Sequence, residues 1–325
     1  GKNMQYRNLG RSGLKVSELS FGSWVTFNKQ VDAQLAEKMF GTCLDAGINF
    51  FDNAEGYERG QSEIVMGKAL KSLGRSRDSY CVSSKVFFGS NENPLPTQIG
   101  LSKKHITEAC HQAMERLQVD YLDMYFCHRA DKETPISETV WAMHNLVAQG
   151  KVLYWGTSEW TAEEITEAYE FAFSNNLTPP TMEQPQYNLL DRDRFENEYG
   201  PLYEEYGLGT TIWSPLASGA LTGKYLDGIP EGSRASLSGY EWLKKSMVES
   251  DRGQNRMKRV SKLVPIAKKL EISLSNLAIA WCLLNKNVST VILGASKLEQ
   301  LEENLKSLEV VPLINDAVQK ELDSI

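Results

Sequence analysis

The stretch "INFFDNAEGYERG", residues 48–60, carries an acid and a phenol at the end of an apolar run. Asp52 follows the apolar residues, and Tyr57 lies five positions further along the chain. Two later apolar runs also end in an ionisable side chain, Lys85 after "CVSS" and His128 after "MYFC". An ammonium beside a phenol stabilises the phenolate, and the phenol, whose ordinary pKa is ~10, becomes a better proton donor. These residue types together predict a site that gives a proton to an oxygen atom.

Each of these residues also has a plain structural interpretation. Lys85 can extend its ammonium to solvent, His128 can be a hydrogen-bonded core residue, and Tyr57 can be a loop aromatic. Convergence on one rim favours the chemical interpretation, because Asp52 would neutralise the buried Lys85. His128 would then orient a carbonyl oxygen beside the phenol.

The proton donor needs a partner that attacks carbon. No GxSxG motif is present, and no cysteine shows a recognisable pairing with a histidine, so the sequence offers no nucleophile. The four histidines form no HExxH motif, which argues against a metal site; they are His105, His111, His128 and His144. We therefore expect a hydride supplied by a nicotinamide cofactor.

Eight short apolar stretches alternate with amphipathic helical patterns, a rhythm typical of parallel βα units. Eight units that close on themselves form a TIM barrel, whose chemistry gathers at the C-terminal ends of the strands. A doubly wound sheet is the main rival, but no GxGxxG motif follows a predicted strand. We therefore predict an α/β fold, a (β/α)8 TIM barrel. The predicted strands are 19–24, 48–54, 80–86, 121–128, 152–158, 181–187, 209–215 and 289–296.

A single barrel domain is expected to cover residues 1–325, with two additions. Residues 1–3 are interpreted as a remnant of an expression tag, and residues 4–18 as an antiparallel hairpin before the first barrel strand. The interval 215–289 is too long for one helix, so we expect a long loop and two helices there, with further helices near the C-terminus.

Several helix ends carry local signals. In the segment 32–47, apolar residues recur at the spacing of one buried stripe, and Gly47 is expected to end that helix as its C-cap. Ser102 is expected to cap the start of a later helix, and Pro135 and Gly150 are expected to bound the next one.

Composition narrows the class of protein. The net charge of −7, without a basic stripe, argues against a nucleic-acid partner. No apolar run approaches the ~18–20 residues that span a bilayer, and the N-terminal stretch does not resemble a secretory signal. The five cysteines are odd in number and form no CxxC pair, which favours a reducing cytosol. We expect a soluble cytoplasmic protein that does not insert into a membrane.

Longer motifs add a family resemblance. The spacing of Asp52, Tyr57, Lys85 and His128, with "GRSGLKVSELSFGSW", "WSPLASGALTGKY" and "LGAS" followed by "QLEEN", resembles the aldo-keto reductases along the whole chain. The stretches "YWGTSEW", "SRASLSGYEWLK" and "LAIAWCL" are most similar to the voltage-gated potassium channel β-subunit branch and its bacterial and plant relatives. This resemblance implies that Tyr57 is the general acid, that Lys85 and Asp52 tune it, and that His128 orients a small-molecule carbonyl substrate.

The resemblance also implies that NADPH or NADP+ is bound across the barrel mouth. The residues expected near the nicotinamide are Ser23, Trp24, Gln30, Asp52, Ser158, Glu159, Gln184 and Trp213. Gly294 is also expected to contact the cofactor. Those expected around the pyrophosphate are Ser214, Pro215, Leu216, Ala217, Ser218 and Gly219. Those expected near the 2′-phosphate and adenine are Lys224, Arg234, Ser296, Gln300, Glu303 and Asn304. Phosphate sites in TIM barrels commonly use the loops after strands seven and eight, although "SPLASG" also reads as an ordinary turn.

Two positions differ from those of the mammalian channel subunits. Glu159 stands where many members of the resembled family carry asparagine and those subunits carry arginine, which bears on one contact with the cofactor carboxamide. His128 stands where mammalian channel subunits carry asparagine, and histidine is the ordinary reductase residue. The resemblance thus favours an NADPH-dependent reductase of aldehydes and ketones. The alternative is a cytoplasmic, homotetrameric partner of a potassium channel whose NADP(H) senses redox state, which rests on subfamily likeness alone.

Overall fold

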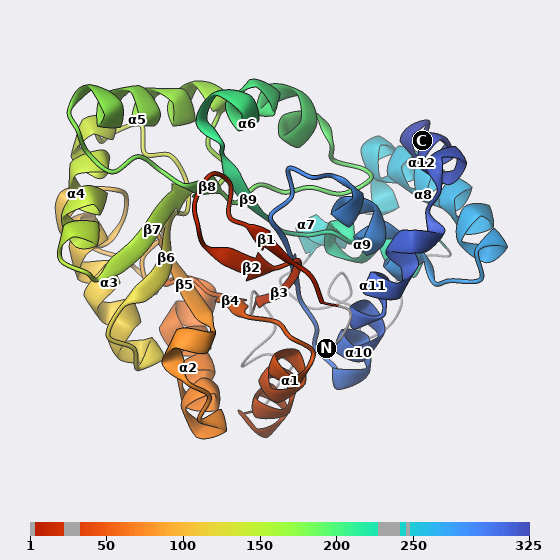
Figure 1. Cartoon of the computed structure of the whole chain (residues 1–325), viewed down its shortest axis with the longest axis horizontal. Coiled ribbons are helices and arrows are strands. Elements are labelled where there is room, and N and C mark those ends of the chain that lie inside the picture. The colour runs from red at the N-terminus through yellow and green to blue at the C-terminus, as the bar shows by residue number, and fades with distance from the viewer. Residues whose placement is uncertain (1–3, 23–32, 227–240, 245–247) are drawn as a thin grey trace.

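Eight parallel strands close into a barrel in the computed structural model, which describes residues 4–22, 33–226, 241–244 and 248–325 (Figure 1). The barrel strands are β3 Leu19–Gly22, β4 Phe50–Asp52, β5 Cys81–Val86, β6 Leu122–Cys127, β7 Val152–Thr157, β8 Met182–Glu183, β9 Gly209–Ile212 and β10 Thr290–Leu293. Barrel strands that follow each other in the sequence pair in parallel, and β10 closes the ring between β9 and β3. The predicted TIM barrel is confirmed.

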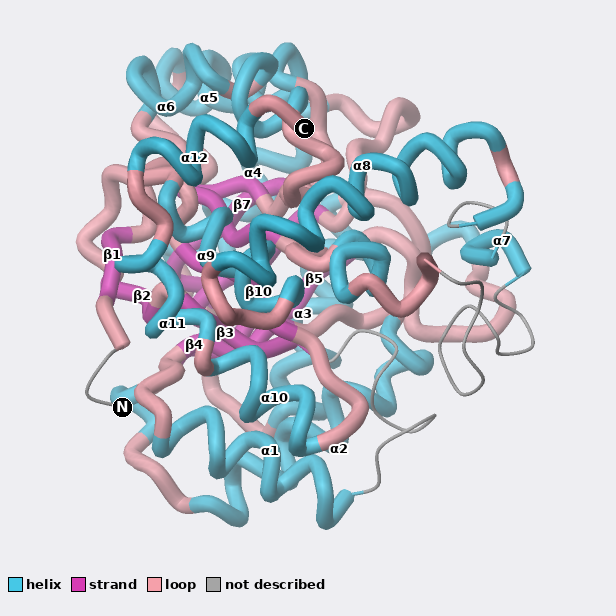
Figure 2. Tube along the Cα trace, turned by 90° about the vertical axis from the view of Figure 1, so that its right-hand side faces the viewer, coloured by secondary structure: helices cyan, strands magenta, loops and turns pink. Residues whose placement is uncertain are grey.

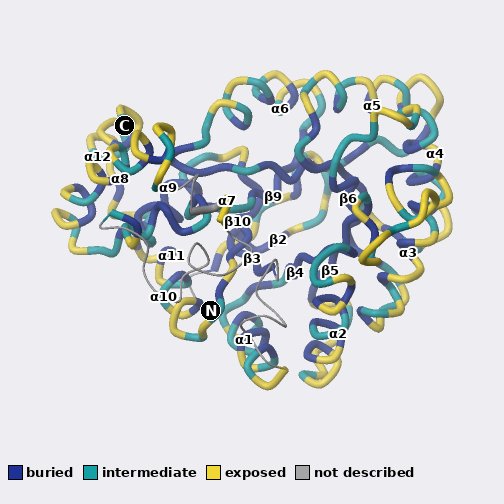
Figure 3. The backbone as a smooth tube through the Cα atoms, turned by 180° about the vertical axis from the view of Figure 1, so that it is seen from behind, coloured by how far each residue is buried: buried dark blue, intermediate teal, exposed yellow. Residues whose placement is uncertain are grey.

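Helices surround the barrel on its outer side (Figure 2). The helices are α1 Ala33–Asp45, α2 Gln61–Leu73, α3 Lys103–Leu117, α4 Ile136–Ala148, α5 Ala162–Ser174, α6 Gly200–Tyr206, α7 Glu241–Lys244, α8 Asp251–Lys269, α9 Leu274–Leu284, α10 Leu298–Leu305, α11 Ser307–Val310 and α12 Asp316–Asp323. The barrel strands are almost entirely buried, whereas the exposed residues lie mainly in loops and on the outward faces of the helices (Figure 3). The main core therefore lies between the barrel and its helices.

An antiparallel hairpin precedes the first barrel strand, as predicted. Its strands are β1 Tyr6–Asn8 and β2 Lys15–Ser17. Leu9 and Val16 of this hairpin belong to one buried cluster with the barrel residues Phe50, Cys81, Met124, Phe126, Met182 and Ile292. Because Phe50 and Cys81 begin their strands, the hairpin covers the N-terminal end of the barrel interior.

The predicted helix caps are present at Gly47 and Ser102. Gly47 has a φ of 96° and its N–H donates to the carbonyl of Leu44 at 3.0 Å, while Ile48 N–H donates to Cys43 at 2.9 Å. This pair of bonds ends α1 and turns the chain toward β4. The Ser102 hydroxyl accepts the backbone N–H of His105 at 3.0 Å at the start of α3.

One predicted strand is shorter in the structure, and the interval 215–289 contains one helix more than predicted within its described residues. The stretch predicted as strand 181–187 contains only β8, because Pro185 has no N–H to donate to a neighbouring strand. Its carbonyl still accepts from Trp213 N–H at 3.1 Å, which keeps the two loops aligned beyond the strands. In the described part of 215–289, the short α7 precedes the two expected helices, α8 and α9.

None of the helices within the described residues combines the length and the apolar character needed to cross a membrane.

Leu9→Ala tests whether the hairpin belongs to the folding core. Leu9 is completely buried, so we expect the free energy of unfolding to fall by about 2–5 kcal/mol, from lost burial and the cavity left behind. Urea denaturation followed by tryptophan fluorescence measures this change. Leu313→Ala is the control, because Leu313 is 47% exposed and its truncation is expected to change the free energy by less than about 0.5 kcal/mol. Equal effects of the two variants would show that the hairpin is not part of the core.

Candidate active site

Three adjacent strands bring the predicted proton-handling residues to one rim of the barrel. Asp52 is the last residue of β4, Lys85 is the penultimate residue of β5, and His128 follows β6 directly. Because β4 pairs with β5 and β5 with β6, their carboxyl ends lie side by side. Tyr57 opens a tight turn, Tyr57–Gly60, between β4 and α2. The structure thus gathers all four residues.

Lys85 and Asp52 form a buried ion pair. The Lys85 Nζ lies 2.5 Å from Asp52 Oδ2, and it also donates to the carbonyl of Asn53 at 3.1 Å. Ser83 donates its hydroxyl to Asp52 Oδ1 at 2.6 Å, and Gln184 Nε2 lies 3.3 Å from the same oxygen. Burial disfavours the charge on Lys85, but Asp52 and Tyr57 outweigh that effect and raise the pKa of Lys85. The lysine is therefore held as an ammonium.

Tyr57 lies against this ammonium. The Lys85 Nζ is 4.9 Å from the centre of the Tyr57 ring and is a hydrogen-bond partner of the phenol. Burial is the largest influence and raises the pKa of Tyr57, whereas Lys85 and Arg129 lower it and Asp52 raises it. The predicted effect of the ammonium is present, but desolvation exceeds it. The phenol consequently keeps its proton at neutral pH until an acceptor arrives.

His128 completes the group as a neutral imidazole. Its ring centre is 5.7 Å from that of Tyr57, with the planes at 80°. Burial lowers the pKa of His128 well below its ordinary value, and the positive charges of Lys85 and Arg129 lower it further. The buried Nδ1 has no hydrogen-bond partner among the described residues. A buried nitrogen of this kind is suited to a polar group of a bound molecule.

Together these side chains can act on a carbonyl oxygen. The phenol has a proton to donate, the ammonium stabilises the negative charge left behind, and the neutral imidazole can offer a hydrogen bond. The ion pair keeps the ammonium in place, so that little reorganisation is needed when charge develops.

Ser158 and Gln184 lie at the ends of β7 and β8, next to the ion pair. Both are buried, and the Ser158 hydroxyl donates to the Gln184 carbonyl at 2.8 Å. The Gln184 side-chain amide lies between Asp52 and Thr211, 3.1 Å from the Thr211 hydroxyl. These two residues therefore connect the proton-handling group with the strand ends expected to hold an amide of the cofactor.

Glu159 organises the neighbouring loop. Its backbone has a φ of 57°, and its Oε2 accepts the indole N–H of Trp213 at 3.1 Å and the N–H of Gln186 at 2.7 Å. Its Oε1 lies 3.3 Å from an Arg194 guanidinium nitrogen. The carboxylate thus fixes the orientation of Trp213, whose ring is expected beside the nicotinamide.

The loop after β9 has an unusual backbone. Ser214, Ala217, Ser218 and Gly219 all have positive φ, and Ser218 N–H donates to the Ser214 hydroxyl at 3.0 Å. A Cβ built at Gly219 would lie 2.7 Å from Cε and 3.0 Å from Nζ of Lys224. The absence of that Cβ lets a cation lie against a compact turn, an arrangement that fits a phosphate group. The expected residues Pro215 and Leu216 lie within the same loop.

The loop after β10 leads into α10. Gly294 is exposed at the end of the strand, and the Oε1 of Gln300 accepts from the Ser296 N–H at 2.9 Å and the Ser296 hydroxyl at 3.1 Å. Glu303 accepts from the Asn276 side chain at 3.1 Å, and Asn304 is buried on the same helix. Because β9 pairs with β10, this loop and the loop after β9 leave neighbouring strands.

Four expected cofactor residues lie outside the described residues. They are Ser23, Trp24, Gln30 and Arg234.

Two further residues were not predicted from the sequence. Ser83 shares a strand face with Lys85, because side chains two positions apart point the same way, and this spacing was the available signal. Glu183 is completely buried and accepts from the Thr157 hydroxyl and from the N–H groups of Glu159 and Trp160. Burial, and secondarily Glu159, raises the pKa of Glu183 to about 8. An acid inside a two-residue strand gave no sequence signal.

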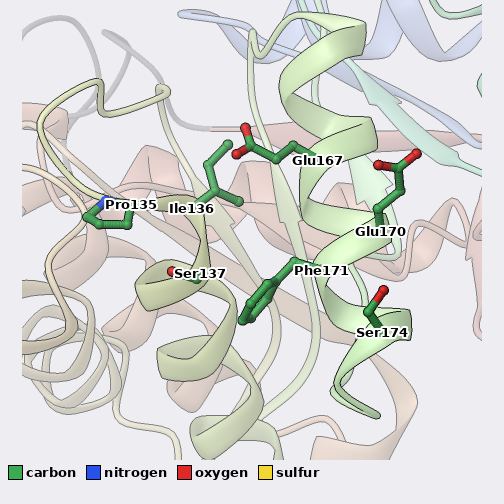
Figure 4. A pocket seen from close by; sticks show the side chains of 7 residues that line it. All are labelled: Pro135, Ile136, Ser137, Glu167, Glu170, Phe171 and Ser174. Atoms are coloured by element: carbon green, nitrogen blue, oxygen red, sulfur yellow. The ribbon is translucent and has the colours of Figure 1, made fainter.

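Two other kinds of site, a metal centre and a surface pocket, would be alternatives to the proton-handling group. No cluster of three or more potential metal ligands occurs among the described residues. A surface pocket of about 340 Å³ lies between α4 and α5 (Figure 4). It is lined by Pro135, Ile136, Ser137, Glu167, Glu170, Phe171 and Ser174, none of which belongs to the proton-handling group.

Comparison with known proteins gives matches along almost the whole chain. The sequence profile of the Aldo/keto reductase family matches residues 18–325. A protein of Oryza sativa subsp. japonica named "Probable voltage-gated potassium channel subunit beta" is 49% identical over 323 residues, which cover 99% of this chain and 96% of that protein. A protein of the same name from Arabidopsis thaliana is 47% identical over 323 residues, with the same coverage.

Lys85→Met tests the energetic coupling of the ion pair. The substitution leaves the Asp52 carboxylate buried without its cation, so we expect a loss of about 3–5 kcal/mol in the free energy of unfolding. The double variant Asp52→Asn/Lys85→Met should lose less than Lys85→Met alone, because no charge remains unpaired. Urea denaturation followed by circular dichroism measures each value.

The control for this prediction is an exposed ion pair. Arg75 lies 2.6 Å from Asp45 on the surface, and Arg75→Met is expected to cost less than about 1 kcal/mol. If the effects of Asp52→Asn and Lys85→Met simply add, the two groups are not coupled.

Proposed function

Because the chain belongs to the aldo/keto reductase family, a family of oxidoreductases, we propose that it reduces aldehydes and ketones to alcohols with NADPH. The observation that carries this proposal is the phenol of Tyr57 set against the buried Lys85–Asp52 pair, with the neutral His128 beside it. The expected substrate is a small carbonyl compound.

In the proposed reaction Tyr57 is the general acid. NADPH, when bound, supplies a hydride to the carbonyl carbon. The carbonyl oxygen takes the proton of Tyr57, and the Lys85 ammonium stabilises the phenolate that remains. Asp52 keeps that ammonium charged and in position. His128 is neutral, so it can donate a hydrogen bond to the same oxygen without adding a competing charge.

Features at both ends of the rim support the cofactor. Ser158 and Gln184 offer polar groups for the carboxamide, and Glu159 orients the indole of Trp213 as a platform for the nicotinamide ring. Lys224 against Gly219 offers positive charge for the phosphates. We propose that Ser296 and Gln300, with Lys224, favour NADPH over NADH through its 2′-phosphate, and that Glu303 and Asn304 lie at the adenine. The proposal also includes Ser23, Trp24, Gln30 and Arg234.

The similarity to two plant proteins named as probable channel subunits supports a second candidate function. In this alternative, a homotetramer of the chain binds a potassium channel, and its bound NADP(H) reports redox state. Brisk oxidation of NADPH with an aldehyde favours the reductase, whereas bound cofactor that scarcely turns over favours the sensor.

Tyr57→Phe tests the role of the phenol. Loss of the general acid is expected to lower kcat by about 10²-fold or more, because positioned proton transfer contributes 10²–10⁴ in rate. NADPH should still bind, since the substitution leaves the residues expected at the cofactor unchanged. Steady-state NADPH oxidation with 4-nitrobenzaldehyde measures the rate, and quenching of intrinsic fluorescence measures cofactor binding.

Tyr121→Phe is the matched control. Tyr121 lies beside Arg77, just before the start of β6 and away from the rim, so its hydroxyl should not affect turnover. Retention of wild-type turnover by Tyr57→Phe would refute the assignment of Tyr57 as the acid.

A further inference from the structure

Glu55 is a buried carboxylate that the proposed reaction does not use. It lies between β4 and Tyr57 and is 1% exposed. Its Oε2 accepts the backbone N–H of Phe87 at 2.7 Å and that of Gly89 at 3.0 Å. Its Oε1 lies 3.1 Å from Nε2 of His105. A single carboxylate thus joins the turn that carries Tyr57 to the loop after β5 and to α3.

The contacts of His105 determine its protonation state. Its Nδ1 lies 2.6 Å from the carbonyl of Gly100, and its Nε2 faces Glu55. A carbonyl and a carboxylate both accept hydrogen bonds, whereas a neutral imidazole carries only one N–H. Both contacts together therefore require a second proton. We place it on the imidazole, because an imidazole, with an ordinary pKa of ~6.5, is a stronger base than a glutamate carboxylate, with an ordinary pKa of ~4.3.

The pair holds both ends of the segment 87–100. Glu55 binds its beginning at Phe87 and Gly89, and His105 binds its end at Gly100. The two ends also meet directly, because Gly100 N–H donates to the Phe87 carbonyl at 2.7 Å. Release of either contact would loosen a segment that has no regular strand of its own.

Phe88, within this segment, forms a wall beside the proposed site. Its ring centre is 5.1 Å from that of His128, with the planes at 76°, and the Arg129 guanidinium lies 5.6 Å from it. Phe88 is also 44% exposed, so the surrounding core does not fix it. The contacts of Glu55 with the N–H groups of Phe87 and Gly89 restrain the backbone on either side of Phe88.

We propose that Glu55 and His105 are a pair of positioning residues, which act through the segment 87–100 to hold Phe88 beside His128 and thereby set how tightly a carbonyl substrate binds. This inference rests on the proposed reductase function. Neither residue needs to touch the substrate or the transferred proton, so their effect should fall on KM more than on kcat.

Other charged groups near the pair are themselves compensated. Glu63 on α2 interacts electrostatically with Glu55, but its own carboxylate is paired with Arg116 at 2.8 Å. Tyr125 on β6 also faces Glu55 and is uncharged, because burial raises its pKa well above the ordinary value. On the loop after β6, the carboxylate of Asp131 is engaged by the backbone N–H of Leu101, which donates to it at 2.9 Å.

The pair gives the segment a pH dependence of definite sign. Burial disfavours the charge on His105, but Glu55 and the Gly100 carbonyl outweigh it and raise the pKa of His105. A raised pKa means that the contribution is complete below the unfolded value of about 6.5 and is lost as pH rises through the folded value. Above that value, one of the two imidazole contacts must break, and the segment should loosen.

The test compares the full-length wild type with His105→Gln and Glu55→Gln. Both variants should raise the KM for 4-nitrobenzaldehyde by about 5-fold or more, which corresponds to about 1 kcal/mol, and change kcat by less than about 2-fold. In a Phe88→Ala background, His105→Gln should leave KM unchanged, because the wall is already absent. In the wild type, KM should rise with pH, and this rise should be absent in His105→Gln.

Hydrogen exchange of the segment 87–100 provides a readout that does not depend on turnover. After correction for intrinsic rates, exchange should be faster in His105→Gln and should increase with pH in the wild type. Asp123→Asn is the matched control: Asp123 is also a buried carboxylate that binds a backbone N–H and a cation, but at the opposite end of the barrel. It should lower stability without changing KM.

Unchanged exchange in His105→Gln would overturn the proposal whether or not the protein reduces a carbonyl. Faster exchange with an unchanged KM would also overturn it and would leave the reductase function intact. An absence of turnover in the wild type, with faster exchange in the variant, would instead refute the proposed function. It would still support the role of Glu55 and His105 in holding the segment 87–100.

Discussion

The rim of this barrel depends on one buried charge and its partner. An ammonium at the end of a closed barrel loses its hydration, and Lys85 is stable there because Asp52 lies 2.5 Å away on the neighbouring strand. The need to neutralise this buried ammonium also determines the positions of neighbouring side chains. Ser83 and Gln184 bind the other carboxylate oxygen, so residues of β4 and β5 and the residue after β8 meet at one ion pair. Tyr57 and His128 then lie within the field of a cation whose position is set by the fold.

Burial at this rim affects the pKa values of the ionisable side chains differently. Burial raises the pKa of Tyr57 and lowers that of His128, so both are neutral at physiological pH, while Asp52 keeps Lys85 charged. A neutral donor, a neutral imidazole and a fixed cation therefore coexist within a few ångströms. In solution the same groups would compete for protons.

Buried glutamates hold the loops behind the rim. Glu55 binds the segment after β5, Glu183 binds the turn after β7, and Glu63 accepts from the hydroxyl of Ser84 at 2.7 Å. The carboxylate of Glu159 contacts the indole of Trp213. Hydrogen bonds from backbone N–H groups to these buried glutamates thus help to position segments at the rim.

The sequence alone determined the features that depend on local patterns. Apolar stretches alternating with helical stripes predicted the eight-stranded barrel, and Gly47 and Ser102 predicted helix ends, because strand periodicity and caps are properties of a few adjacent residues. Asp52, Lys85 and His128 could be placed at strand tips for the same reason. Only the tertiary structure decided which charges meet. The contact of Glu55 with His105 joins residues fifty positions apart, and the pKa of Tyr57 depends on how deeply the closed barrel excludes water.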